Sequence, residues 1–181
     1  MRYLSFKFNN ETYSYKNSGF EPMPSKILHN NIEKQYTGNS VSLDTGDNFI
    51  IVKYDSPVEV KNMFKGINCI SISFDFGGSS FKGSGTSMFE DCSARNISLK
   101  NAGNYNFTSI DSMFSGCNSL LNLYIDGINT RKVENMEKLF YKCYSLISID
   151  LSLFYTEENV NMNYMFSGCS NLISIKFTSE S

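Results

Sequence analysis

Residues 135–151 read NMEKLFYKCYSLISIDL, and this stretch decides the fold because close copies of it recur along the chain. Its Leu-Phe pair is one of five pairs in which a large apolar residue precedes phenylalanine. The pairs are Met63-Phe64, Met88-Phe89, Met113-Phe114, Leu139-Phe140 and Met165-Phe166. Their phenylalanines are 25, 25, 26 and 26 residues apart. Because a fixed period of this size is the signature of stacked repeats, the sequence predicts a repeat array.

The remainder of each repeat predicts how one coil runs. A short alternating run follows every pair, at residues 72–74, 97–99, 123–125, 149–151 and 175–177. Such alternation is typical of a strand with apolar residues facing inward. The return segment 133–140 has apolar residues at a helical or 3₁₀ spacing. We therefore expect a β-rich α/β solenoid, namely a short leucine-rich-repeat array of about five coils of 25–26 residues over 57–181, with a small N-terminal β cap domain over 1–56.

The best copies carry a resemblance to a known family. Residues 135–151 and 165–175 resemble the Asn-Met, Met-Phe, Cys, Ser-Leu and Leu-Asp-Leu pattern of BspA-type leucine-rich repeats. The resemblance covers roughly residues 58–177, and the first two copies depart from it by shortened strand approaches and by residues 81–85. It implies a non-enzymatic, surface-exposed binding protein, often an adhesin, from bacteria or protists. It fixes no ligand.

Four cysteines occupy one position of the repeat, three residues after the phenylalanine. They are Cys92, Cys117, Cys143 and Cys169. The first coil has Ile67 there, and Cys69 falls out of frame, which indicates that the position needs a buried apolar side chain. One cysteine per coil would spread four sulfurs over more than about 14 Å, too far to share one zinc ion. We therefore expect structural thiols, with no metal or other cofactor, and disulfides as the less favoured alternative.

Residues 1–56 lack the repeat and predict a different, β-rich unit. Leu4, Phe6 and Phe8 alternate before a turn and a second alternating run at 13–15, which predicts a hairpin. A second hairpin is expected between 41–43 and 49–54, and a short helix over 25–36. Because a solenoid needs its first coil covered, we expect this unit to be a cap, with docking as an added role.

Composition excludes several classes of function. The 181 residues have a formal net charge of −2 and no basic cluster, which argues against nucleic acid as the partner. The longest aliphatic run, residues 50–52 beside Phe49, is far too short to cross a bilayer, so no membrane insertion is expected. The first residues show no apolar signal core. His29 is the single histidine, which excludes mechanisms that need two histidines and leaves His29 as the one candidate base for most hydrolytic triads.

We therefore predict no enzymatic activity. The remote alternative is an aspartic-type hydrolase using Asp44, because residues 44–46 read Asp-Thr-Gly. That chemistry needs two carboxylates sharing a proton, and the chain has no second such triplet. A calcium loop built from Asp44, Asp47 and Asn48 is also disfavoured, because no glutamate follows at a suitable distance. Asp47 and Asn48 are expected in a turn.

The outward strand positions remain as the expected functional surface. One column reads Ser71, Asn96, Asn122, Ser148 and Ser174, and the next reads Ser73, Ser98, Tyr124, Asp150 and Lys176. The candidate interaction face is Asn122, Tyr124, Ser148, Asp150, Ser174 and Lys176, and Tyr124 is its expected anchor because aromatic residues dominate interface energetics.

Two functions follow from this surface. The first is a binding module that recognises a protein or glycan ligand at a cell or particle surface. The alternative is a structural subunit of a larger assembly, such as a phage virion or an extracellular filament, whose neighbours cap the open repeat end. We expect the C-terminal coil to be covered, since an uncovered strand offers unpaired backbone groups. A capping partner or a continuation of the chain is favoured, and a homo-oligomer or the tail folded over the coil are the alternatives.

Overall fold

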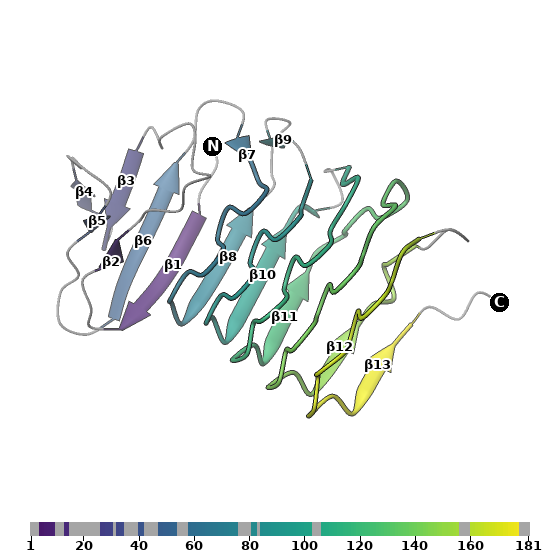
Figure 1. The fold of residues 1–181 in the computed structure, drawn as a ribbon. Coiled ribbons are helices and arrows are strands. Elements are labelled where there is room, and N and C mark those ends of the chain that lie inside the picture. Colours follow the sequence, from purple (N-terminus) through teal and green to yellow (C-terminus); the bar gives the residue numbers. More distant parts are fainter. Residues whose placement is uncertain are drawn as a thin grey trace.

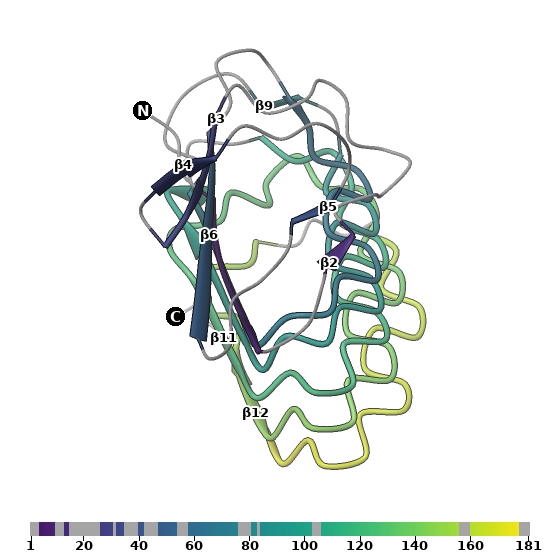
Figure 2. The ribbon, with the colours of Figure 1, turned by 90° about the vertical axis from the view of Figure 1, so that its left-hand side faces the viewer.

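The protein is described here from a computed structural model. It describes residues 4–9, 13–14, 26–30, 32–34, 40–41, 47–53, 58–75, 81–82, 84–102, 106–155 and 160–177. These residues form a solenoid with two walls, parallel strands on one side and stacked turns on the other (Figure 2). The predicted solenoid is confirmed, with about four complete turns. We number its coils one to five by Phe64, Phe89, Phe114, Phe140 and Phe166.

The strand wall contains one strand from each coil, and the alternation in the sequence places them correctly. In the first three coils β8 (Ser71–Asp75), β10 (Asn96–Lys100) and β11 (Asn122–Ile125) pair in parallel. In the last two coils β12 (Ser148–Asp150) and β13 (Ser174–Lys176) form a separate parallel pair. Within each group, equivalent residues of neighbouring coils pair in register, and the successive arrows lie side by side in Figure 1.

The turn wall differs from the helical return segment that the apolar spacing predicts. No α-helix forms among the described residues. Two residues of every coil, at positions −2 and +2 from the phenylalanine, have left-handed backbone angles, with φ of 52–59° and 57–82° respectively. A right-handed helix needs φ near −63°, so these residues break the helix twice per coil. The apolar residues of this segment instead lie in tight turns, whose Met and Phe side chains point inward.

The core lies between the two walls. The five coil phenylalanines stack in one row with ring centroids 5.1–5.5 Å apart, and the rings between Phe89 and Phe166 are within 7° of parallel. Phe64, Phe89, Phe114 and Phe140 are at most 1% exposed. Inward strand residues such as Ile97 and Leu99 complete the core. One coil cannot bury these side chains by itself, so the stack supplies the hydrophobic free energy that holds the wall in place.

The N-terminal strands continue the strand wall. The seven-stranded sheet has the order β11-β10-β8-β1-β6-β3-β4, and β1 (Leu4–Asn9) runs antiparallel to β8 and β6 (Asp47–Lys53) (Figure 1). Short pairs form between β2 (Tyr13–Ser14) and β5 (Ser40–Val41), and between β7 (Val58–Glu59) and β9 (Phe81–Lys82). The predicted boundary between residues 56 and 57 stays a prediction.

The N-terminal pairings correct three predictions. Among the described residues, the strands expected at residues 4–8 and 13–15 do not pair with each other, because β1 pairs with β6 and β8, and β2 pairs with β5. Of the strand expected at 41–43 only Val41 is described, and it pairs with Tyr13 rather than with β6. The helix expected over 25–36 is wrong: β3 (Lys26–His29) and β4 (Ile32–Lys34) form an antiparallel pair. Asn30 has φ 49°, a conformation that asparagine accepts at little cost in a tight turn.

Asp47 and Asn48 also differ from expectation, since they belong to β6 rather than to a turn. Asp44 and the rest of residues 42–46 lie outside the described residues. None of the described segments forms a helix that is long and apolar enough to cross a bilayer.

Candidate interaction surface

All six candidate residues lie on the outward face of the last three strands. Asn122, Tyr124, Ser148, Asp150, Ser174 and Lys176 are exposed. Their strand neighbours Leu123, Ile149 and Ile175 face the core, as the period of two requires. The register brings Ser148 opposite Ser174 and Asp150 opposite Lys176. No strand ladder joins β11 to β12 among the described residues, so the candidates fall into a group on β11 and a group on β12–β13.

The two charges of this face neutralise each other. The Lys176 ammonium donates a hydrogen bond of 2.7 Å to Asp150 Oδ2. The Ser152 backbone N–H donates to Asp150 Oδ1 at 2.9 Å. The hydrogen bond from Lys176, followed by those from Ser152, lowers the pKa of the Asp150 carboxyl to about 2. The face therefore offers a partner a paired charge rather than a field of one sign, which favours neutral ligands over polyions.

On β11 the exposed residues are an amide and an aromatic ring. Asn122 donates from its side-chain Nδ2 to Asn96 Oδ1 on β10 at 2.8 Å, which continues the polar column across two coils. Tyr124 is 61% exposed and stands in register with Ser98. A small neighbour leaves the tyrosine ring accessible from the side of β10, a geometry that suits stacking against a flat ligand.

An apolar column beside these strands was missed by the sequence reasoning. Leu121, Ile147 and Ile173 directly precede β11, β12 and β13 and are 42%, 51% and 85% exposed. They line a shallow groove together with Ser145, Ser170, Asn171 and Leu172. The signal was present in the sequence, because these residues share one position of the repeat, seven after the phenylalanine. Exposed aliphatic residues in a row are uncommon on a solvated face and mark interaction sites.

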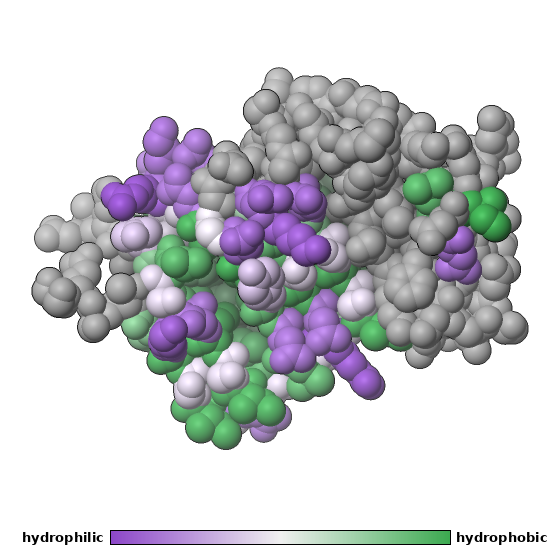
Figure 3. All heavy atoms as spheres, turned by 180° about the vertical axis from the view of Figure 1, so that it is seen from behind, coloured by the Kyte–Doolittle hydropathy of each residue, from purple (hydrophilic) through white to green (hydrophobic). Residues whose placement is uncertain are grey.

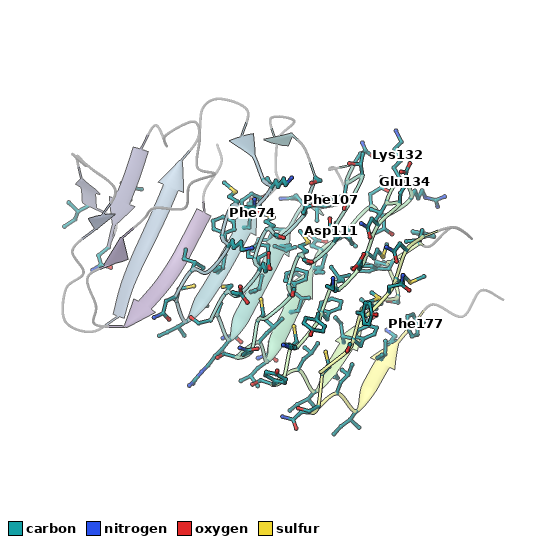
Figure 4. The ribbon with its side chains drawn as sticks, in the orientation of Figure 1. Phe74, Phe107, Asp111, Lys132, Glu134 and Phe177 are labelled. Carbon is teal, nitrogen blue, oxygen red and sulfur yellow. The ribbon has the colours of Figure 1, made fainter. Side chains whose placement is uncertain are left out.

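Elsewhere on the described surface, exposed apolar residues also occur on the fifth coil, where Met162, Tyr164 and Phe177 are 42%, 64% and 62% exposed. Seen from behind, hydrophobic and hydrophilic residues lie side by side over the coils (Figure 3). Asp111 lies on the turn wall and accepts hydrogen bonds of 2.6 Å from Thr86 and from Ser109 (Figure 4). Lys132 and Glu134 lie at the corner where the fourth coil enters the turn wall (Figure 4). The hydrogen bond from Thr86 to Asp111 connects the second and third coils.

The cysteines have the structural role that their position predicts. Cys92, Cys117 and Cys143 are fully buried, Cys69 is 6% exposed, and all five thiols are free. The thiols of Cys117, Cys143 and Cys169 each donate to the carbonyl of the preceding coil's phenylalanine at 2.9–3.1 Å. Burial raises the pKa of the Cys117 thiol well above its ordinary value, so it stays protonated and unreactive. Among the described residues no three His, Cys, Asp or Glu side chains cluster closely enough to hold a metal ion.

Comparison with known proteins gives one match. The family model described as "Mycoplasma protein of unknown function, DUF285" matches residues 84–177, which is more than half of the chain and includes the phenylalanines of coils two to five. No curated protein and no solved structure matches the chain.

Proposed function

The chain belongs to the DUF285 family, and from this premise we propose that it is a non-catalytic recognition module. It binds a protein or glycan ligand through the outward face of its strand wall and the adjoining apolar column. The same proposal assigns it to the BspA-type leucine-rich repeats and places it at a cell or particle surface. The repeat motif at residues 135–151 and 165–175 supports that assignment.

The observation that carries the proposal is the juxtaposition of three kinds of exposed group. Leu121, Ile147 and Ile173 form an apolar column, Tyr124 adds an aromatic ring, and Asn122, Ser148 and Ser174 add short polar side chains. Recognition sites combine an apolar or aromatic anchor with a few polar groups that fix orientation. Because the strands hold these side chains on a regular backbone, little conformational entropy is lost when a ligand binds.

A binding screen with matched variants tests this proposal. The intact chain is immobilised and probed with a glycan array and with solubilised surface proteins. A ligand of the strand face loses at least about ten-fold in affinity with Tyr124→Ala or Ile147→Ser, since truncating a hot-spot residue costs about 2 kcal/mol or more. Tyr155→Ala is the matched control, because Tyr155 is a tyrosine of similar exposure that lies outside the face. Equal binding by all three variants would contradict the proposal.

The exposed fifth coil favours one second candidate, a structural subunit of an assembly. Met162, Tyr164 and Phe177 are 42%, 64% and 62% exposed at that end of the solenoid. A neighbouring subunit seated there would bury them. Light scattering across a concentration series separates the two functions, because a subunit of a homomeric assembly associates at micromolar concentration whereas a recognition module stays monomeric.

A further inference from the structure

The strand wall is interrupted between the third and fourth coils. β10 pairs with β11 and β12 pairs with β13, but in the part of the chain that the structure describes no ladder joins β11 to β12. Most Cα pairs between β12 and β13 lie within 8 Å of each other, whereas nearly all Cα pairs between β11 and β12 are farther apart than 8 Å. Paired parallel strands are about 4.8 Å apart, so a gap separates β11 from β12 (Figure 1). We call this gap the slot.

The slot is confined to the strand wall, because hydrogen bonds join the third and fourth coils at both ends of the strands. Before the strands, the Ser145 hydroxyl donates a hydrogen bond of 2.6 Å to the Asn118 carbonyl. Beyond them, the Thr130 hydroxyl donates to the Tyr155 carbonyl at 2.8 Å and accepts from the Tyr155 N–H at 2.7 Å. On the turn wall the phenylalanine rings of the two coils stack with centroids 5.4 Å apart. The two coils are therefore held together around the slot, and only the strands between these contacts stand apart.

The β11 rim of the slot carries backbone groups that have no ladder partner on β12. Within a sheet, a strand directs the backbone N–H and C=O of alternate residues to opposite neighbours. The N–H groups of Asn122 and Asp126 donate to carbonyls of the second coil at 3.1 and 2.9 Å. Leu123 and Ile125 alternate with these residues, so their N–H and C=O groups point to the slot.

The β12 rim carries the complementary groups. The Leu151 N–H donates to the Lys176 carbonyl of the fifth coil at 2.7 Å, so the alternate residues Ser148 and Asp150 direct their backbone groups to the slot. β11, β12 and β13 all begin eight residues after their coil phenylalanine, and β12 and β13 pair in register. The two rims therefore oppose donors and acceptors in the arrangement that forms the ladder between β12 and β13.

The inward side chains of β11 are less buried than those of the neighbouring coils. Leu123 and Ile125 are only partly buried, whereas Ile97 of the second coil and Leu151 of the fourth are 1% exposed. The third coil has a coil on both sides, so its place in the stack does not explain this exposure. Bringing β12 onto β11 covers both side chains, and the burial of apolar surface favours that movement.

We propose that the slot closes, so that the strand wall has an open form, which is the form described above, and a closed form in which β12 pairs with β11. Closure forms the missing ladder and covers the side chains of Leu123 and Ile125. The hydrogen bonds at Asn118 and Thr130 stay in place, so only the strands between these two corners move.

Closure regulates the candidate interaction face, and this part of the inference rests on the proposed function. Asn122 and Tyr124 lie on one rim of the slot, and the remaining candidates lie on β12 and β13. Closing the slot brings the two groups to the spacing of paired strands. A ligand that contacts both groups at this spacing binds the closed form more tightly and shifts the equilibrium towards it.

Backbone amide exchange in the full chain without ligand tests whether the slot closes. Tyr124 is the internal control, because it alternates with Leu123 and Ile125 on β11 and lies in the β10 ladder. The Leu123 and Ile125 amides exchange at least about ten-fold faster than the Tyr124 amide, yet more slowly than in an unfolded peptide, because the closed form protects them part of the time. Protection equal to that of Tyr124 would show a permanent ladder, and exchange at the unfolded rate would show a slot that never closes. Either result overturns the proposal.

A proline on the β12 rim blocks closure and separates it from other sources of protection. Ser148 is the first residue of β12, where proline is tolerated, and its N–H points to the slot and takes no part in the pairing with β13. Ser148→Pro therefore speeds exchange of the Leu123 and Ile125 amides by at least about three-fold and leaves Tyr124 unchanged. Ser148→Ala, which keeps the N–H, changes none of these rates. Equal rates in the two variants overturn the proposal, and the measurement on the unmodified chain decides it where Ser148→Pro does not fold.

The effect on recognition is measured separately, with the glycan array and solubilised surface proteins as probes. A component whose binding is weakened by Tyr124→Ala binds at least about ten-fold more weakly to Ser148→Pro than to Ser148→Ala, because the proline variant cannot adopt the closed form. Equal binding by the two Ser148 variants, with the Tyr124→Ala loss intact, overturns the regulation and leaves the recognition function standing. Absence of any bound component overturns the proposed function, while the exchange rates alone still decide whether the slot closes.

Discussion

The fourth and fifth coils have the same motif but bury it to different extents. Phe140 and Cys143 are completely buried, whereas Phe166 and Cys169 at the equivalent positions are only partly buried. Met136 is buried and its counterpart Met162 is 42% exposed. The difference comes from the neighbour, since the fourth coil has a coil on both sides and the fifth has only one among the described residues. A residue's contribution to stability in this protein therefore depends on its place in the stack more than on its identity.

The largest expected effect is on the phenylalanine row. Phe114→Ala should lower the free energy of unfolding by about 3–5 kcal/mol, because it opens a cavity between two stacked rings. Phe166→Ala should cost about half as much, because its ring stacks on one side only and is already partly exposed. Urea titrations of the two variants measure the difference. Equal losses would mean that the fifth coil is covered in solution.

A smaller effect is expected at the left-handed glycines. Gly116 has φ +72°, and a Cβ added there would meet the Asp91 carboxylate. Gly66 has φ +69° and open space around the same point. Both alanine variants incur the strain of a left-handed residue, about 1 kcal/mol, and Gly116→Ala should cost about 1 kcal/mol more because Asp91 must move. Adding Asp91→Ala to Gly116→Ala should recover that excess, and a double-mutant cycle from denaturation midpoints measures it.

The sequence was sufficient for the repeat but insufficient for its local conformation. The spacing of Phe64, Phe89, Phe114, Phe140 and Phe166 predicted the buried row, and the strand alternation predicted which side chains face solvent. The left-handed residues were not predictable from residue type, since Ser112, Lys138 and Tyr164 share one backbone angle without sharing chemistry. The backbone hydrogen bonds between neighbouring coils impose that angle, and these hydrogen bonds exist only in the assembled stack.

In the N-terminal strands the local conformation was predictable from the sequence, but the strand pairing was not. Alternation identified the strand at residues 4–8, but it carries no information about which strand pairs with it. β1 lies between β6 and β8, and even its nearest pair in sequence, Asn9 with Asp47, is 38 residues apart; such non-local pairing is not encoded in a turn signal. For the candidate face, the polar columns were predicted, whereas the apolar groove at Leu121, Ile147 and Ile173 appears only once the coils are aligned.

Thiol reactivity compares the burial of the cysteine position in different coils without a substitution that would change stability. Cys169 is partly buried, whereas Cys92 and Cys117 are fully buried. Iodoacetamide should therefore label Cys169 first in the folded chain, because the thiolate is the reactive form and only an accessible thiol can ionise and be attacked. Cys92 and Cys117 should react only when urea unfolds the chain. Peptide mapping by mass spectrometry measures this, and equal labelling of Cys117 and Cys169 under native conditions would contradict the burial difference.

The smallest expected effect is at the exposed pair that joins the fourth and fifth coils across the strand wall. The pKa of Asp150 is lowered to about 2 from an ordinary value of 3.8, first by the hydrogen bond from Lys176. A carboxyl with a lowered pKa stabilises the folded state above pH 4, and this contribution disappears as the pH falls towards 2. Because Lys176 and Asp150 are 68% and 54% exposed, water and salt screen the pair, so Lys176→Met should lower the urea midpoint at pH 7 only slightly. The same variant should raise the pKa of Asp150 towards 3.8 in a carboxyl ¹³C titration, and 1 M salt should raise it in the unmodified chain. An Asp150 titration that responds to neither change would show that the side-chain ion pair does not form in solution, and that β12 and β13 are joined at this point by their backbone ladder alone.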